Sequence, residues 1–217
     1  MNNIIIGVDE AGRGPLFGSV YTGAATFYNS NDVDKSCLKD SKKYTKKSLL
    51  KTYDYINSNI ELISYDYADC KEIDKCNILQ ATQNSMHRCI NKLITKIIEK
   101  SKEENNFNTN IFSNIKLLID GNYFKPYYYC YEDSIYYITH ECVVKGDQIH
   151  KEISTASIIA KVERDNYIID FIEKNPEYGE KYDLLNNKGY GTKKHIEGIR
   201  KYGYSEYHRN SFKLKCL

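Results

Sequence analysis

Residues 4–15, with the sequence IIIGVDEAGRGP, decide the fold class of this 217-residue chain. The run Ile4–Val8 is apolar and rich in β-branched residues, which predicts a buried strand. Asp9 and Glu10 come next, and a Gly-Arg-Gly segment follows them. Neighbouring residues on a strand point to opposite faces. We therefore expect the chain to bend at the glycines and bring both acids to one site.

The rest of the chain alternates between strand-like and helix-like patterns. Four more stretches rich in β-branched and aromatic residues predict strands: 19–28, 60–67, 115–119 and 136–144. Apolar residues three or four apart predict a long helix from Glu72 to beyond Ile97 and two more over 152–174 and 192–201. Loops are expected at 29–34, 101–110 and 175–187. This order predicts an α/β chain with a mixed sheet.

The composition is that of a single globular domain. The 31 basic and 29 acidic residues give a net charge of +2, and 41% of the residues are hydrophobic. This balance argues against a polycation that binds through charge alone, while a local basic face stays open. The seven cysteines form no CxxC pair, which argues against a disulfide framework and a structural zinc site. With no signal peptide and no membrane-length apolar run, the sequence predicts a cytoplasmic protein that binds no membrane.

Carboxylates follow three of the expected strands, as Asp9 with Glu10, as Asp120 and as Asp147. An acid at a strand end is also a common turn former, so each has a structural explanation when taken alone. Carboxylates that converge at one edge of a sheet repel one another, and a divalent cation explains such a cluster better. Oxygen-only ligands suit Mg²⁺ or Mn²⁺. Four carboxylates can hold two such ions about 4 Å apart for in-line displacement at a phosphodiester.

Short motifs along nearly the whole chain resemble those of the ribonuclease HII family, the type 2 ribonucleases H. The segment GVDEAGRGPL at 7–16 resembles the family signature. The other motifs follow in the family's order: DSKK at 40–43, EID at 72–74, NIL at 77–79, LIDGN at 118–122, KGD at 145–147, ISTASIIAKVERD at 153–165, KGY at 188–190 and HRNSF at 208–212. Together they identify the chain as a member of this family, of bacterial type.

The resemblance implies a fold and an activity. The fold would be α/β and ribonuclease H-like, a mixed five-stranded sheet flanked by helices, with a small helical C-terminal part. Residues 1–217 would form one catalytic domain, with the core over about 1–175 and a basic substrate-binding part over about 176–217. The activity would be hydrolysis of the RNA strand of RNA–DNA hybrids and incision 5′ to single ribonucleotides embedded in duplex DNA.

The resemblance also assigns the chemistry to particular residues. Asp9, Glu10, Asp120 and Asp147 would be the catalytic residues and the ligands of two Mn²⁺ or Mg²⁺ ions. One ion would activate the attacking water and the other would stabilise the leaving 3′ oxygen. The products would carry a 5′-phosphate and a 3′-hydroxyl.

A second group of residues is expected to bind the substrate: Gly12, Arg13, Gly14, Lys42, Lys43, Asn77 and Tyr190. By resemblance, the Gly-Arg-Gly backbone approaches the ribose, and Tyr190 packs on the next sugar. The two lysines would meet phosphates. Asn77 would lie near the DNA backbone, although at a helix start it could equally be a cap. Independently, residues 188–215 carry eight basic and two acidic residues, which predicts a duplex-binding face.

Two alternatives stay open. A ribonuclease HIII-like hybrid nuclease would share the acids, but Asp9 so near the N-terminus and the intact Gly-Arg-Gly segment argue against it. A non-catalytic module that binds RNA–DNA hybrids is opposed by the presence of all four acids. No obligate protein partner and no clamp-binding tail are evident, and we expect a monomer.

Overall fold

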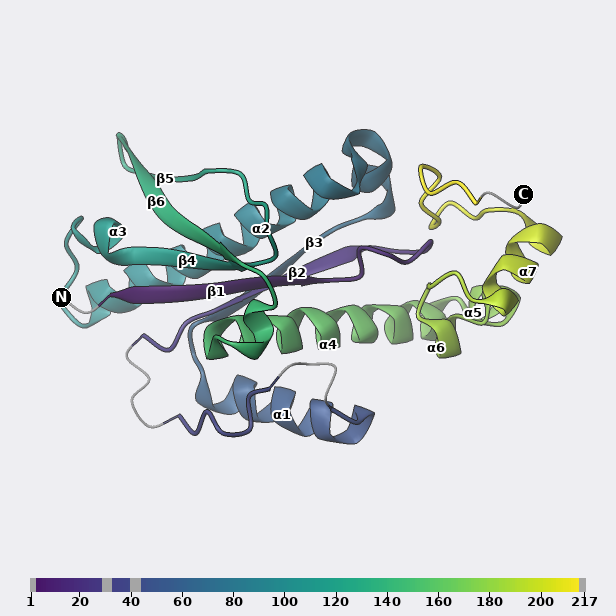
Figure 1. Cartoon of the computed structure of the whole chain (residues 1–217), viewed down its shortest axis with the longest axis horizontal. Helices are drawn as coiled ribbons and strands as arrows, with labels where there is room; N and C mark the ends of the chain where they lie inside the picture. The colour runs from purple at the N-terminus through teal and green to yellow at the C-terminus, as the bar shows by residue number, and fades with distance from the viewer. Residues whose placement is uncertain (1–2, 29–32, 40–43, 215–217) are drawn as a thin grey trace.

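The computed structural model describes residues 3–28, 33–39 and 44–214. Within these ranges, the centre is a mixed six-stranded sheet of order β3-β2-β1-β4-β6-β5 (Figure 1). The strands are β1 (Ile4–Ala11), β2 (Val20–Ala25), β3 (Ile63–Ala68), β4 (Ile115–Asp120), β5 (Tyr127–Tyr131) and β6 (Ser134–Val143). The central β1 pairs antiparallel with β2 and parallel with β4, and β4 is parallel to β6. The carboxyl ends of β1, β4 and β6 therefore lie at the same edge.

Helices cover both faces of the sheet (Figure 1). The helices are α1 (Lys46–Asn59), α2 (Cys70–Glu103), α3 (Ile111–Asn114), α4 (Lys151–Lys174), α5 (Pro176–Tyr182), α6 (Leu184–Asn187) and α7 (Lys193–Tyr202), with a 3₁₀ turn η2 (Gly146–Gln148). Apolar residues of α2 and β1 form the main core on one face. On the other face α4 packs against the sheet and α1 packs outside α4. The short helices α5 to α7 lie beyond the far end of α4 (Figure 1).

The helix α4 touches the sheet directly because two strand positions lack side chains. A Cβ atom on Gly7 would lie 2.1 Å from the backbone carbon of Glu152. One on Gly23 would lie 2.3 Å from the carbonyl oxygen of Ala156. Neither position has room for a side chain, so these glycines fix where α4 crosses β1 and β2.

The sequence predicts the fold class and five of the strands correctly, but the five-stranded count is wrong. The extra strand is β5, which pairs antiparallel with β6. Its sequence, YYYCY, alternates between buried Tyr127 and Tyr129 and more exposed neighbours. With 21 tyrosines spread along the chain, this alternation gives little contrast in sequence.

The three expected helices are confirmed as α2, α4 and α7, and other helices were not expected. The helix α1 shows a weak pattern because its buried residues are confined to Leu49, Thr52 and Ile56. The expected loop at 175–187 is wrong, since this stretch forms α5 and α6. Pro176 occupies the first turn of α5, where its missing N–H is no disadvantage.

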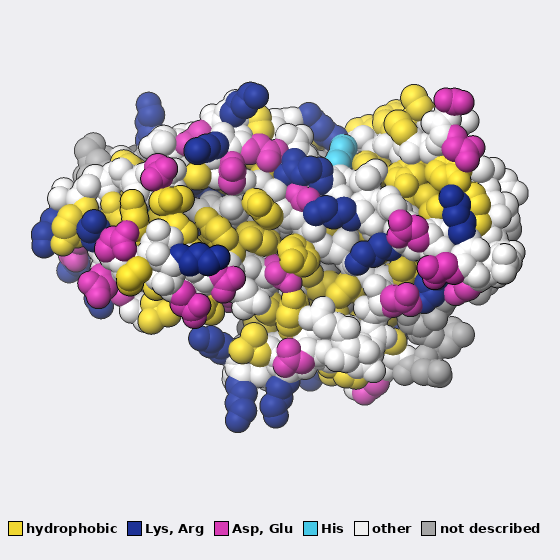
Figure 2. All heavy atoms as spheres, turned by 180° about the vertical axis from the view of Figure 1, so that it is seen from behind, with side chains coloured by type: hydrophobic (Ala, Val, Ile, Leu, Met, Phe, Trp, Pro, Cys, Tyr) yellow, Lys and Arg dark blue, Asp and Glu magenta, His cyan; other side chains and the backbone are white. Residues whose placement is uncertain are grey.

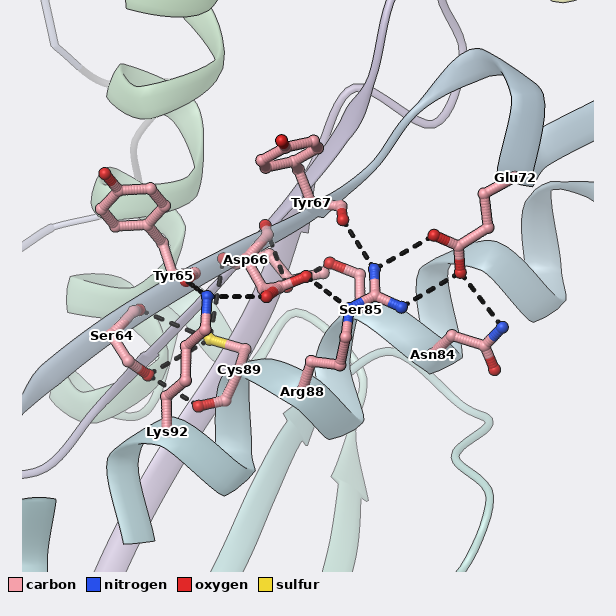
Figure 3. Close-up of polar contacts among 11 residues, drawn as sticks. Ser64, Tyr65, Asp66, Tyr67, Glu72, Asn84, Ser85, Arg88, Cys89 and Lys92 are labelled. Carbon is pink, nitrogen blue, oxygen red and sulfur yellow. Dashed lines mark hydrogen bonds and ion pairs between the residues drawn. The ribbon is translucent and has the colours of Figure 1, made fainter. Parts of the chain in front are cut away.

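The edge strand β3 is covered by long cationic side chains from α2 (Figure 3). The donors and acceptors are Arg88 Nη2 and Tyr67 O at 2.6 Å, Lys92 Nζ and Tyr65 O at 3.2 Å, and Lys96 Nζ and Ile63 O at 2.8 Å. The three cations are four residues apart on the helix, a rise of about 6 Å. Their acceptors are two residues apart on the strand, a rise of about 6.6 Å, so the two spacings match. These cations occupy carbonyls that could otherwise pair with another strand.

The surface carries charges of both signs. On the face opposite to that of Figure 1, lysine and arginine side chains are interspersed with acidic ones, and hydrophobic side chains lie between them (Figure 2). This mixture agrees with the net charge of +2. Among the helices of the described ranges, none combines the length and apolar character needed to cross a membrane.

Candidate active site

Asp9 and Glu10 lie near the carboxyl end of β1 and line one pocket of about 340 Å³. The strand continues to Ala11, which pairs with Tyr21 of β2, so the chain bends after the two acids rather than between them. Asp9 is buried, and its Oδ1 accepts a hydrogen bond from the backbone N–H of Glu10 at 2.7 Å. Both acids thus reach the pocket from a regular strand.

Asp120 ends the adjacent parallel strand β4 and lines the same pocket. Val8 pairs with Ile119, so Asp9 and Asp120 are the next residues on neighbouring strands. The Oδ1 of Asp120 accepts a hydrogen bond from the backbone N–H of Gly146 at 2.6 Å. Asp120 and Glu10 also line a second hollow, of about 290 Å³, on the α2 side. Glu10 and Asp120 therefore border both hollows.

The charged forms of Asp9 and Glu10 are destabilised by burial and by the neighbouring carboxylates. Burial raises the pKa of Asp9 well above its usual value, and repulsion from Glu10 and Asp120 raises it further. Burial also raises the pKa of Glu10, and the nearby Arg13 guanidinium opposes this shift. The Arg13 Nη1 lies 3.2 Å from Glu10 Oε1. The negative charge of this cluster is only partly neutralised by nearby cationic groups. Such a set of carboxylate oxygens suits a hard divalent cation.

Asp147 does not line this pocket. It is buried in η2. In residues 3–28, 33–39 and 44–214, no three His, Cys, Asp or Glu side chains already stand as a metal site. The structure thus brings Asp9, Glu10 and Asp120 together in one pocket. It places Asp147 directly after Gly146, whose backbone N–H donates to Asp120.

Two buried arginines that the sequence did not single out for this role lie against the Gly12–Gly14 turn, and one of them, Arg209, donates hydrogen bonds to its backbone. Gly12 has a φ of +90°, a conformation that favours glycine. A Cβ there would lie 2.0 Å from Nε of Arg164. Arg209 was counted in the basic C-terminal face, and this is wrong, because Arg209 is buried and donates to Gly12 O at 2.7 Å.

Tyr190 lies beside this turn, as expected. The residue is 46% exposed and lines the pocket with the acids. The guanidinium carbon of Arg164 lies 5.6 Å from the ring centroid. A Cβ on Gly14 would have the Tyr190 ring as its neighbour, at 3.6 Å. The turn, the ring and the acids therefore surround one space.

The remaining expected substrate-binding residues are Asn77, Lys42 and Lys43. Asn77 is exposed at a kink in α2, with φ of 68° and ψ of 162°. Its Oδ1 accepts from Gln80 N at 3.1 Å, so it acts as a helix cap. Lys42 and Lys43 lie outside the described residues.

The basic C-terminal stretch is mostly exposed. Of its eight basic residues, the exposed ones are Lys193, Lys194, Arg200, Lys201 and Lys213. Lys188 is half-buried, and Lys215 lies beyond the part of the chain that the structure describes. Five basic side chains are therefore exposed at this end of the molecule.

The mixed sheet, with acids at the ends of β1 and β4 and helices on both faces, is the ribonuclease H-like fold. The ribonuclease H2 of Pyrococcus horikoshii OT3 superposes with a TM-score of 0.67 at 23% identity, covering 97% of this chain and 94% of that one. Bst-RNase HIII, solved in complex with Mn²⁺, superposes with a TM-score of 0.57 at 19% identity, covering 93% of this chain and 63% of that one. The expected fold class is confirmed.

Sequence comparison narrows this class to one family. The profile of ribonuclease HII matches residues 6–215. The ribonuclease HII of Francisella tularensis subsp. mediasiatica is 37% identical over 210 residues, which cover 97% of this chain and 95% of that protein. The chain belongs to the ribonuclease HII family, as its motifs indicate, and is a ribonuclease H that cleaves RNA–DNA hybrids.

Proposed function

We propose that this ribonuclease H also incises duplex DNA on the 5′ side of single embedded ribonucleotides, using Asp9, Glu10, Asp120 and Asp147. One observation carries the proposal. Asp9, Glu10 and Asp120 line a pocket that Gly12 and Tyr190 also line. The groups that would cut the backbone and those that would inspect the sugar thus share one space.

The four acids would hold two divalent ions, Mn²⁺ or Mg²⁺. All-oxygen donors and the raised pKa of Asp9 and Glu10 support this, because a cation would relieve their repulsion. Bound there, the ions would supply an activated water and stabilise the charge on the leaving 3′ oxygen. Within the chain, the Arg13 side chain orients Glu10, and the Gly146 N–H orients Asp120. Products with a 5′-phosphate and a 3′-hydroxyl follow from in-line attack by water.

Recognition of the ribose would fall to the Gly12–Arg13–Gly14 backbone and to Tyr190. A protein can distinguish RNA from DNA at one nucleotide only through contacts near the 2′-hydroxyl. Gly14 carries no side chain, and a Cβ there would have only the Tyr190 ring within 4 Å, so the backbone at this residue can approach a sugar closely. The exposed ring of Tyr190 offers a flat apolar surface to the adjoining deoxyribose.

The flanking duplex would meet cationic and polar groups. Lys42, Lys43, Asn77 and the exposed basic residues of the C-terminal part are proposed to contact its phosphates. The ribonuclease HII of Archaeoglobus fulgidus has been solved in a complex with PCNA. For the present chain, a monomer without an obligate protein partner and a cytoplasmic location stay predictions from sequence.

A duplex cleavage assay tests this proposal. The substrates are a labelled DNA duplex with one ribonucleotide and a long RNA–DNA hybrid, each with Mg²⁺, Mn²⁺ or EDTA. We expect metal-dependent cutting 5′ to the ribonucleotide, lost in Asp120→Asn and kept in Asp54→Asn, whose carboxylate is exposed on α1. Cutting of the hybrid alone would contradict the proposed junction role of the turn and Tyr190. Binding without cutting of either substrate would favour the non-catalytic module.

A further inference from the structure

Tyr190 lies in an exposed loop between α6 and α7, where its backbone groups are hydrogen-bonded. The Tyr190 N–H donates to Asn187 O at 2.9 Å, and the Tyr190 carbonyl oxygen accepts from Thr192 N–H at 2.8 Å. Both partners are within three residues, so these two bonds do not fix Tyr190 relative to the rest of the protein. A third bond comes from α7, where Nδ1 of the buried His195 lies 2.9 Å from the same carbonyl oxygen.

His195 is itself oriented by a second buried histidine. Burial lowers the pKa of both rings, which are therefore neutral at pH 7. A carbonyl oxygen can only accept, so His195 Nδ1 carries the proton and His195 Nε2 is an acceptor. His208 Nε2, 3.0 Å away, donates to it, and His208 Nδ1 accepts from the backbone N–H of Ser205 at 2.9 Å. The donors therefore run in one direction, from Ser205 through both rings to Tyr190.

The segment that carries His208 also holds the turn at Gly12. Arg209, the next residue, donates from Nη2 to Gly12 O at 2.7 Å. The backbone N–H of Arg209 donates to Leu16 O at 2.8 Å, just after the turn. One short segment thus contacts both parts of the proposed recognition site, the turn directly and Tyr190 through the two rings.

Aromatic side chains leave the histidine rings little room to move. The centroid of the His208 ring lies 4.6 Å from that of Tyr182 and 5.1 Å from that of Phe17. A close-packed interior resists the displacement of such rings. The two histidines therefore hold the Tyr190 carbonyl at a defined distance from the turn.

A pair that served stability alone would not need these polar atoms. Replacing both partners of a buried hydrogen bond by apolar groups of the same shape is often nearly neutral. The chain of donors ends, however, on the backbone of a residue that lines the pocket with Asp9, Glu10 and Asp120. This end point indicates a role in placing Tyr190.

We propose that His195, oriented by His208, is a positioning residue, which fixes Tyr190 relative to the Gly12 turn and so sets the preference for a ribonucleotide followed by a deoxyribonucleotide. The inference rests on the proposed function, in which Tyr190 packs on the adjoining deoxyribose. Neither histidine touches the substrate, because both are fully buried. Loosening Tyr190 should therefore change which linkage is cut more than whether the acids can cut.

Two substitutions of His195 separate positioning from stability. His195→Gln places an amide near the former Nε2, so it keeps an acceptor for His208 and loses the donor to Tyr190 O. His195→Asn places an amide N–H near the former Nδ1, so it keeps that donor and loses the acceptor. The two variants form a matched pair, in which each retains one of the two hydrogen bonds of the ring.

The substrate is a labelled DNA duplex with a run of consecutive ribonucleotides, cut in Mn²⁺ and resolved by product length. Incision 5′ to the last ribonucleotide has a deoxyribose as the adjoining sugar, whereas incision 5′ to an earlier one has a ribose. The ratio of this junction incision to internal incision is the readout. Both products come from the same reaction, so the ratio does not depend on how much of a variant is folded.

His195→Gln should lower this ratio by about tenfold, the effect of losing one well-placed hydrogen bond. His195→Asn should keep a ratio close to that of the wild type. Tyr190→Ala should lower the ratio as well, and adding His195→Gln to Tyr190→Ala should change it no further, because both substitutions act through the same ring.

Equal ratios in His195→Gln and His195→Asn, or a wild-type ratio in His195→Gln, would show that the inference is wrong. A further loss when His195→Gln is added to Tyr190→Ala would also contradict it. A wild type that incises at a single ribonucleotide without any junction preference would overturn the inference and leave the proposed function standing. A wild type that cuts a long hybrid but not a duplex with one ribonucleotide would overturn the proposed function and the inference with it.

Discussion

Two groups of carboxylates in this chain differ in how their charges are balanced. On the α2 side of β3, Asp66 Oδ1 lies 2.7 Å from Arg88 Nε, and its Oδ2 lies 2.7 Å from Lys92 Nζ (Figure 3). Glu72 shares the same guanidinium at 3.1 Å. At the ends of β1 and β4, three acids lie together with one ion pair among the described residues, between Arg13 and Glu10.

This difference separates structural charge from functional charge. In the balanced group, each acid has a cationic partner, and the contacts join α2 to the edge strand. In the unbalanced group, the raised pKa of Asp9 and Glu10 reports charge that the fold itself does not neutralise. Two buried arginines show the same difference. The guanidinium of Arg209 donates to three backbone carbonyls, whereas Nε and Nη1 of Arg164 have no hydrogen-bond partner among the described residues. Groups left unsatisfied in a pocket are the ones expected to meet substrate or metal.

The largest expected effect comes from neutralising the unbalanced group. Asp9→Asn should lower the cleavage rate by at least about 10³-fold, because it removes a carboxylate from a cluster that acts as a unit. Its unfolding free energy should not fall, since repulsion with Glu10 and Asp120 is relieved. Single-turnover cleavage and urea unfolding measure the two quantities. A variant that is less stable but fully active would contradict the contrast.

The pH dependence of stability extends the comparison to two buried histidines whose ring nitrogens all have hydrogen-bond partners. His195 Nε2 and His208 Nε2 lie 3.0 Å apart, and both rings are fully buried. Ser205 N–H donates to His208 Nδ1, so His208 Nε2 carries the proton, and His195 Nδ1 in turn donates to Tyr190 O. Burial, with repulsion from His195, lowers the pKa of His208 to about 3.

Protonation of the unfolded chain should therefore reduce stability in acid. Below about pH 6.5 the unfolded chain binds a proton at His208, whereas the folded chain does so only near pH 3. Stability should fall as the pH is lowered through this window, by about 1–2 kcal/mol between pH 7 and pH 5 from this group. Urea unfolding of the wild type and His208→Gln measures the difference. Equal losses in both proteins would show that His208 does not contribute.

Breaking the balanced group should affect stability rather than catalysis. Asp66→Ala leaves Arg88 and Lys92 without one partner on the α2 side of β3. We expect a loss of about 1–2 kcal/mol in unfolding free energy, since Asp66 is mostly buried but its partners reach solvent. Cleavage of the ribonucleotide duplex by the folded protein should stay within about twofold of wild type. A large loss of activity would mean that this network also serves the site.

The smallest expected effect concerns the edge of the sheet. Lys92→Leu combined with Lys96→Leu uncovers the carbonyls of Tyr65 and Ile63 on β3. An uncovered edge strand can pair with a second copy. Light scattering across a concentration series should then show self-association of the double variant at concentrations where the wild type shows none. Identical behaviour would show that the side chains do not protect the edge.

Much of the fold was predictable because its central elements have strong patterns. The apolar run before Asp9 and the stripe of α2 give clear periodicity, and the motifs place the remaining blocks in order. The sequence missed β5 and α1, whose tyrosine-rich or polar residues have little hydrophobic contrast and depend on tertiary packing.

The site was predictable to the level of residue types at strand ends. The register of β1 and β4, which brings Asp9 beside Asp120, agrees with the prediction of one carboxylate edge. The distinction between Arg209 and Arg164 was not available, because both are single basic residues in sequence. Which donors are satisfied depends on backbone carbonyls brought together from distant segments, such as Gly12 and Lys188.

The stability of the protein with and without metal tests the central claim most directly. Urea unfolding of the wild type and Asp9→Asn would be measured in EDTA and in excess Mn²⁺. We predict that Mn²⁺ stabilises the wild type, by about 2.7 kcal/mol at one hundred times its Kd, and that Asp9→Asn in EDTA is at least as stable as the wild type but gains little from Mn²⁺. Equal Mn²⁺ effects in both proteins, or none in the wild type, would contradict the assignment of the unbalanced carboxylates to metal binding.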